Sequence, residues 1–283
     1  MSKLHSLGLL ISLFMLSACV TGSLENRISA ATSIADQGGL QPVRIPTSRF
    51  NLFGYQRFLS ENEAITLYIE GDGLAWVDRR TVSPNPTPIN PVALRLAAVD
   101  SSPNVVYLAR PCQYLDLSME KNCNRSTWTS HRFSRDILDS YHQALNRISK
   151  ESGNTAFHLV GFSGGAAIAA LLASERHDVL SLQTVAGYLD HATLNERHGV
   201  SPLEGSLNPI SVAHRLVDLP QLHFAGEDDS IALPEVIESF GEAVGSSACA
   251  GILTVENVTH QGGWVAFWEQ RKGIKPRCNG VYD

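Results

Sequence analysis

The stretch Phe157-His158-Leu159-Val160-Gly161-Phe162-Ser163-Gly164-Gly165-Ala166-Ala167-Ile168-Ala169-Ala170 decides the fold of this chain. Residues 157–160 predict a buried strand, and the alanine-rich residues 164–174 predict a helix. Between them the pattern G-x-S-x-G places Ser163 on a sharp turn, where bulky neighbours would collide with the strand and helix backbones. A helix N-terminus beside the serine favours negative charge. Ser163 is therefore a candidate nucleophile, the alternative being a tight glycine turn that holds a serine by chance.

Strands and helices alternate along the rest of the chain. Apolar and β-branched runs predict five more strands, at residues 64–69, 104–109, 179–185, 221–225 and 251–255. Apolar density and helical spacing predict helices at residues 92–99, 133–150, 236–244 and 264–271. This alternation predicts an α/β fold, with a mostly parallel central sheet and helices on both faces. In such folds sites gather beyond the carboxyl ends of the strands, so the residues after each strand are the candidates.

This arrangement resembles the α/β-hydrolase family, whose catalytic triad follows the chain order Ser, acid, His. The loop Gly226-Glu227-Asp228-Asp229 is similar to the family's G-x-x-D loop, so the resemblance makes Asp229 the acid. Asp228 is the adjacent alternative and Asp190 a more distant one, while a solvated acidic turn is the structural alternative. The histidine is expected after the last strand, where His260 precedes two glycines and a helix.

The resemblance also implies an oxyanion hole. One donor is the backbone N–H of Gly164, and the second comes from the loop Glu70-Gly71-Asp72-Gly73, with Gly71 or Asp72 as the first candidates and Gly73 a further one. Many family members have His-Gly there, whereas two acids stand in this loop. They are unfavourable beside a developing oxyanion unless they point away or pair with an arginine. The candidate partners are Arg79, Arg80 and Arg110. The segment from this loop through Ala109-Arg110-Pro111-Cys112-Gln113-Tyr114 also resembles that of uncharacterised bacterial exported α/β-hydrolases.

The beginning of the chain predicts an export signal. Residues 1–18 combine a positive start, a short apolar stretch and small residues, and Leu16-Ser17-Ala18-Cys19 resembles a bacterial lipobox. The resemblance implies a lipid on Cys19 and, since Val20 rather than Asp follows, the outer membrane facing the periplasm. A soluble secreted protein is the alternative. The predicted organisation is a signal peptide at 1–18, a lipidated tether at 19–45 and an α/β-hydrolase domain at 46–283.

Four cysteines remain after Cys19. An even number in an exported chain suggests two disulfides with three possible connectivities. We expect local pairing, Cys112 with Cys123 and Cys249 with Cys278, because each pair brackets one loop or terminal region. Zinc is the competing interpretation, and the absence of C-x-x-C spacing disfavours it. No metal and no cofactor are expected.

The charge composition limits the classes of partner that the protein binds. The 22 Lys and Arg against 28 Asp and Glu, a net charge of −6, exclude nucleic acid as the main partner. Residues 76–91, 111–128 and 188–219 are expected to line the site, the last of them as a small lid segment. The alternative is that these three insertions have no role in selectivity. The predicted function is a serine hydrolase of esterase or lipase type, which cleaves a small-molecule or lipid acyl bond through an acyl-enzyme at the bacterial cell envelope. The alternatives are an acyltransferase with the same triad and a catalytically inactive envelope binding protein. The sequence indicates no oligomeric state.

Overall fold

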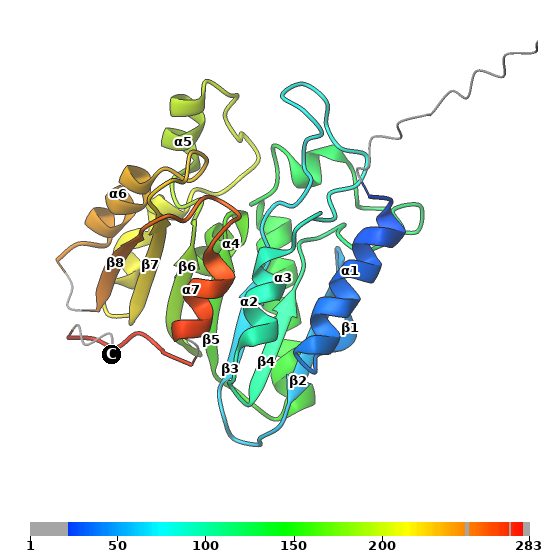
Figure 1. Ribbon diagram of the computed structural model, residues 1–283, viewed down its shortest axis with the longest axis horizontal. Coiled ribbons are helices and arrows are strands. Elements are labelled where there is room, and N and C mark those ends of the chain that lie inside the picture. Colours follow the sequence, from blue (N-terminus) through cyan, green and yellow to red (C-terminus); the bar gives the residue numbers. More distant parts are fainter. Residues whose placement is uncertain (1–21, 247–248, 272, 280–283) are drawn as a thin grey trace, which may run out of the picture.

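The computed structural model describes residues 22–246, 249–271 and 273–279, so the predicted signal peptide and Cys19 lie outside the described residues. One eight-stranded sheet has the order β1-β2-β4-β3-β5-β6-β7-β8 (Figure 1). The strands are β1 Gln41–Pro46, β2 Asn51–Phe58, β3 Ile65–Ile69, β4 Asn104–Leu108, β5 Phe157–Phe162, β6 Val179–Val185, β7 Gln221–Gly226 and β8 Ala250–Val255. β2 is antiparallel to both β1 and β4, and every other pairing is parallel.

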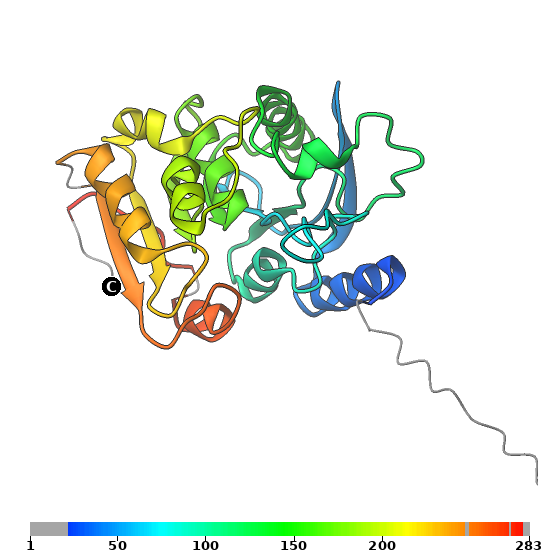
Figure 2. The same ribbon diagram turned by 90° about the horizontal axis from the view of Figure 1, so that it is seen from above.

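Helices cover both faces of the sheet (Figure 2). The helical segments are α1 Leu24–Gln37, α2 Val92–Val99, η1 Arg125–Trp128, α3 Arg135–Ser152, α4 Gly164–Ala173, α5 His191–His198, η2 Pro209–Leu216, α6 Pro234–Val244 and α7 Trp264–Arg271. One core joins α3, α4, α6 and η2 to the sheet, and a second joins α1, α2 and α7 to its other face. None of the described helices combines the length and apolar character needed to cross a membrane.

The predicted fold class is confirmed. β3 and β4 are buried along their whole length, as expected for parallel strands covered on both faces. The loops that follow β3, β4 and β6 lie together at the upper edge of Figure 1. This edge holds the carboxyl ends of the parallel strands, where the sequence placed the candidate site residues.

The predicted tether at 19–45 is wrong for its described part. Ser23 caps α1 by accepting a hydrogen bond from the backbone N–H of Asn26 at 3.2 Å. Ala31, Ile34 and Ala35 are buried against α2, and β1 pairs with β2. These apolar residues at three- and four-residue spacing bury one face of the helix, although serine, threonine and alanine dominate the local composition. The folded domain therefore begins at about residue 23 rather than residue 46.

The predicted lid segment at 188–219 is only in part a cover. Its first half carries α5, which lies at the upper edge of Figure 1. Its second half carries η2, where Ala213 and Leu216 are buried and pack with α4 and α6. The η2 half therefore belongs to the core, whereas the α5 half lies at the edge that holds the candidate site residues.

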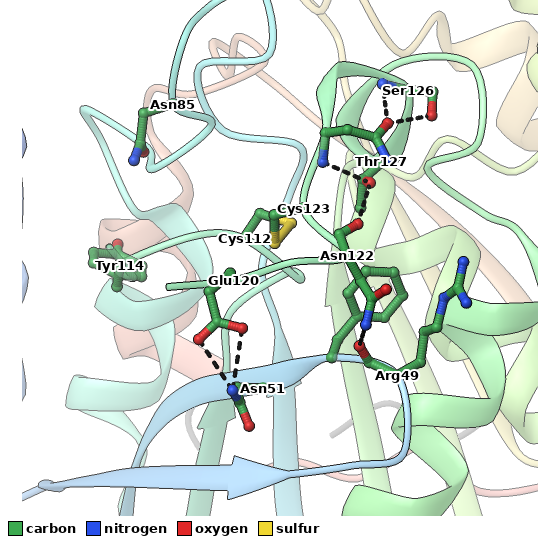
Figure 3. Close-up of a disulfide and its surroundings, with 12 residues drawn as sticks. Arg49, Asn51, Asn85, Cys112, Tyr114, Glu120, Asn122, Cys123, Ser126 and Thr127 are labelled. Atoms are coloured by element: carbon green, nitrogen blue, oxygen red, sulfur yellow. Dashed lines mark hydrogen bonds between the residues drawn. A yellow bond between two sulfur atoms is a disulfide. The ribbon is translucent and has the colours of Figure 1, made fainter. Parts of the chain in front are cut away.

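Two disulfides join the cysteines in the expected pairs, Cys112 to Cys123 and Cys249 to Cys278. The first closes the loop after β4. This loop is also fastened to β2 and its neighbouring turn, because Glu120 accepts hydrogen bonds from Asn51 Nδ2 and Asn122 Nδ2 donates to the carbonyl oxygen of Arg49 (Figure 3). These bonds therefore fix the position of the loop at the upper edge of the sheet.

Candidate active site

Ser163 occupies a strained turn between β5 and α4. Its φ of 51° and ψ of −118° are unusual for a residue with a side chain. The turn is held because the Ser163 N–H donates to the carbonyl oxygen of Val185 at 2.9 Å and its own carbonyl accepts from the N–H of Tyr188 at 3.0 Å. Neighbouring segments therefore fix the backbone in the conformation that directs Oγ toward His260 at the sheet edge.

The two motif glycines make this turn possible. A Cβ on Gly161 would lie 2.5 Å from the Cα of Ala166, and a Cβ on Gly165 would collide with the carbonyl oxygen of Ile69. Any larger residue would separate α4 from β3 and β5. The pattern G-x-S-x-G is therefore a steric requirement of this strand–turn–helix unit.

Three distant residues form a hydrogen-bonded chain. The Ser163 hydroxyl donates to His260 Nε2 at 3.0 Å, and His260 Nδ1–H donates to Asp229 Oδ2 at 2.9 Å. Asp229 is 3% exposed, and its other oxygen accepts the N–H groups of Ile231 and Ala232 at 2.8 and 2.9 Å. The backbone thus holds Oδ1 and leaves Oδ2 for the imidazole. The structure brings together the three residues expected from the sequence.

The alternative acids lie elsewhere. Asp228 is exposed, and within the described residues no hydrogen bond joins it to His260. Asp190 caps α5 by accepting from the N–H groups of Ala192 and Thr193. Of these three candidate acids, Asp229 alone is therefore placed to orient the imidazole.

The His260 loop is fixed by aromatic residues. Trp264 Nε1 donates to the carbonyl oxygen of His260 at 3.1 Å, and the Phe162 ring lies 5.3 Å from the imidazole, centroid to centroid. Trp264 is 1% exposed, so the loop is tied to the hydrophobic core. This packing sets the position of Nε2 opposite Ser163.

The structure of the loop after β3 shows that one expected oxyanion donor, the Gly71 N–H, is wrong. The Gly71 N–H donates to Glu70 Oε1 at 2.9 Å and is therefore not free for a substrate oxygen. The Glu70 carboxylate points away from Ser163, toward the start of α2, where it accepts from the N–H groups of Ala93 and Leu94 and from the Tyr107 hydroxyl. Glu70 is 1% exposed, and burial raises the pKa of its carboxyl to about 7.

The amides of Gly164 and Asp72 remain the candidate donors. Neither N–H donates a hydrogen bond within the part of the chain that the structure describes. A Cβ on Gly164 would overlap the Asp72 carboxylate, so the two residues are in contact beside the nucleophile. Gly73, the further candidate, turns instead against Pro86, and its φ is +65°. Gly164 and Asp72 are therefore the candidate donor pair, because they contact each other beside Ser163.

Two arginines neutralise Asp72. Arg110 Nη1 lies 2.9 Å from Asp72 Oδ1 and Arg132 Nη1 lies 3.1 Å from Oδ2. Arg110 was one of the three expected partners, whereas Arg79 and Arg80 are exposed and form no ion pair with Asp72 among the described residues. Arg132 was not predicted, because it lies 60 positions from Asp72 and no local pattern marks such a contact.

Known structures share this fold at low identity. The esterase Pf2001 of Pyrococcus furiosus is 13% identical with a TM-score of 0.60, over 84% of this chain and 92% of that one. An alpha-beta serine hydrolase homologue from Coxiella burnetii is 15% identical with a TM-score of 0.56, over 81% and 94%. A membrane phospholipase A described as a bacterial virulence factor is 17% identical with a TM-score of 0.55, over 88% and 87%. At these identities the likeness establishes the fold alone.

The family is established by sequence. No curated protein sequence matches this chain significantly. The family model for serine hydrolases (FSH1) matches residues 99–264, which is more than half of the chain and includes Ser163, Asp229 and His260. This protein therefore belongs to the FSH1 family of serine hydrolases and has the α/β-hydrolase fold.

Proposed function

We propose that Ser163, Asp229 and His260 are a catalytic triad that hydrolyses a carboxylic ester, or a related acyl bond, through an acyl-enzyme. The hydrogen-bonded chain from Ser163 through His260 to Asp229 carries this proposal. Its geometry matches that required of a nucleophile, a general base and an orienting acid.

The first half of the reaction forms the acyl-enzyme. Ser163 Oγ attacks the carbonyl carbon while His260 Nε2 takes its proton, and Asp229 stabilises the imidazolium. The tetrahedral oxyanion accepts hydrogen bonds from the amides of Gly164 and Asp72. The imidazolium then protonates the leaving alkoxide as the ester C–O bond breaks.

Water completes the cycle. His260 Nε2 removes a proton from water, whose oxygen attacks the acyl carbon and restores the tetrahedral oxyanion. Collapse of that intermediate breaks the bond to Ser163 Oγ, which regains a proton from His260 and releases the carboxylic acid. The ion pairs of Arg110 and Arg132 offset the Asp72 carboxylate, so its charge does not oppose the oxyanion beside it.

A covalent probe tests the triad. A fluorophosphonate should label the wild-type protein and Ser118→Ala, an exposed control, but not Ser163→Ala. If the folded, oxidised protein is not labelled, the proposed triad is wrong, and the inactive binding protein becomes the better interpretation. 4-Nitrophenyl esters of increasing chain length would then rank the acyl groups that the active enzyme accepts.

The proposal extends to the cell envelope. The lipobox-like Leu16–Cys19 and two disulfides suit a protein exported to an oxidising compartment and anchored through Cys19. Only residues 20–22 separate Cys19 from Ser23, which caps α1, so a lipid on Cys19 would hold the domain near the membrane. Incorporation of an alkynyl fatty acid into the wild type, but not into Cys19→Ala, tests the anchor. Fractionation that finds the wild-type protein only in the soluble fraction would refute it.

A further inference from the structure

A narrow cavity lies beside the oxyanion loop. Its polar lining consists of Asp72, Arg110, Gln113, Thr127, Trp128 and Arg132. The cavity volume is about 10 Å³, which admits a group the size of one water molecule. Asp72 joins the cavity to the nucleophile, because its carboxylate contacts Gly164, the residue after Ser163. A group bound in this cavity would therefore lie close to the reacting carbonyl.

Three buried donors of the lining have no acceptor. They are the Nε of Arg110, the Nε of Arg132 and the Nε1 of Trp128, none of which makes a hydrogen bond within the described residues. Arg110 and Trp128 are only 4% and 6% exposed. Buried N–H groups are almost always hydrogen-bonded, so three unpaired donors around one cavity indicate that an acceptor belongs there.

The charge of the lining indicates that this acceptor is an anion. Arg110 and Arg132 share the single carboxylate of Asp72, and within the described chain neither forms another ion pair, so one positive charge remains. Both guanidinium groups also lie against the Phe133 ring, 5.3 and 5.4 Å from its centroid, which limits their access to water. Burying a net charge is unfavourable unless an opposite charge lies beside it.

The loop that carries Trp128 is held in place by a disulfide and by hydrogen bonds. The Cys112–Cys123 disulfide closes the loop, and the side chain of Asn124 caps η1 by accepting from the Ser126 N–H at 3.0 Å. Thr127 Oγ1 accepts from the N–H of Asn124 at 3.3 Å (Figure 3). The unpaired indole N–H is thus held in place before any ligand arrives, which is the arrangement expected of a binding site.

We infer that this cavity binds one oxygen of a substrate carboxylate, so that the enzyme prefers esters that carry a free carboxylate near the scissile bond. The inference rests on the proposed function, since it names the substrate class of that site. The Nε–H groups of Arg110 and Arg132 and the indole N–H of Trp128 donate to the carboxylate. An acyl substrate can carry a carboxylate near its scissile bond, and the cavity has room for one oxygen of that carboxylate.

Matched esters test the preference. The monoethyl esters of succinate, glutarate and adipate are compared with the corresponding terminal amides, which are neutral and nearly isosteric, and acid release is followed by NMR. For at least one chain length, kcat/KM of the wild type should favour the carboxylate at least tenfold. Trp128→Phe, which removes only the N–H donor, should lower that ratio about tenfold. The exposed Trp76→Phe is the matched control and should leave the ratio unchanged. A wild-type ratio of one or less at every length, or an unchanged ratio in Trp128→Phe, would overturn the inference.

A binding measurement separates the cavity from catalysis. The melting temperature of Ser163→Ala protein is measured with succinate, phosphate or chloride at equal ionic strength. Succinate should raise it relative to chloride, phosphate should not, and the effect should vanish in Ser163→Ala/Trp128→Phe. No succinate effect would mean that the cavity holds only water, and an equal phosphate effect would mean that it is not selective for carboxylates; either result contradicts the inference. Succinate binding in a wild type that hydrolyses no ester would refute the proposed function while supporting the anion site.

Discussion

His260 Nε2 lies 3.0 Å from Ser163 Oγ although 97 positions separate the two residues in the chain. The contact forms because both residues follow strands of one parallel sheet, whose carboxyl ends share an edge. Ser163 follows β5 and His260 follows β8, so the loop after β8 must cross back over β7 and β6 to reach the serine. The buried Trp264, bonded to the His260 carbonyl, fixes the end of that crossing.

The acid of the triad can be tested against its neighbour. Asp229→Asn should lower kcat on a 4-nitrophenyl ester by about 10²- to 10⁴-fold, because the amide can favour the wrong imidazole tautomer. Asp228→Asn alters an exposed side chain and should retain activity within a factor of about two. Equal losses in the two variants would contradict the assignment of Asp229.

Buried Glu70 should make stability depend on pH. Its pKa of about 7 in the folded protein exceeds the ordinary value of 4.5, so the folded state binds the proton more tightly than the unfolded state. The contribution is therefore fully present below about pH 4.5 and is lost as pH rises through 7, with a magnitude of the order of 3 kcal/mol. Urea unfolding of the wild type and Glu70→Gln at pH 5 to 8 isolates this difference from other titrating groups. Parallel stability profiles for the two proteins would show that Glu70 does not titrate in this way.

The steric requirement at the elbow predicts a sharp contrast between two glycines. Gly165→Ala should destabilise the protein by about 3 kcal/mol or more, because its Cβ would meet the backbone oxygens of Ile69 and Glu70, which cannot move independently of β3. Gly153→Ala places a Cβ in open space at a φ of +75° and should cost about 1 kcal/mol. Thermal unfolding measures both changes, and a mild effect of Gly165→Ala would show that α4 is not held so closely.

The Cys112–Cys123 disulfide should contribute to stability through its short loop. The two cysteines are 11 positions apart, and closing such a loop in the unfolded chain is worth about 2 to 3 kcal/mol. The double variant Cys112→Ser/Cys123→Ser should lose about this much free energy of unfolding in urea under oxidising conditions. Under reducing conditions the wild type should lose more, because Cys249–Cys278 is then broken as well. If oxidised wild type and double variant were equally stable, the disulfide would not constrain the unfolded chain.

Much of the fold was predictable because its signals are local. The strands around β3, β4 and β5 are apolar runs, and the spacing in residues 133–150 identified α3 within two residues at each end. The beginning of the domain was missed for a local reason too. The apolar face of α1 consists of only two isoleucines and two alanines, Ile28, Ala31, Ile34 and Ala35, among serines and threonines. The pattern therefore resembles a linker until α2 is packed against it.

What the sequence determined by itself is the strand–turn–helix unit around Ser163 and the chain order of the three candidate residues. These features arise between near neighbours in the chain, so they can be predicted from the sequence. They are the steric exclusion at Gly161 and Gly165 and the side-chain periodicities of strand and helix. Only the tertiary structure determined which groups the two acids after β3 contact. The Glu70 carboxylate accepts hydrogen bonds from the α2 amides and from the Gly71 N–H. Asp72 forms ion pairs with Arg110 and Arg132. Ion pairs and hydrogen bonds between distant segments depend on where the folded chain places them, and they impose no periodicity on the sequence.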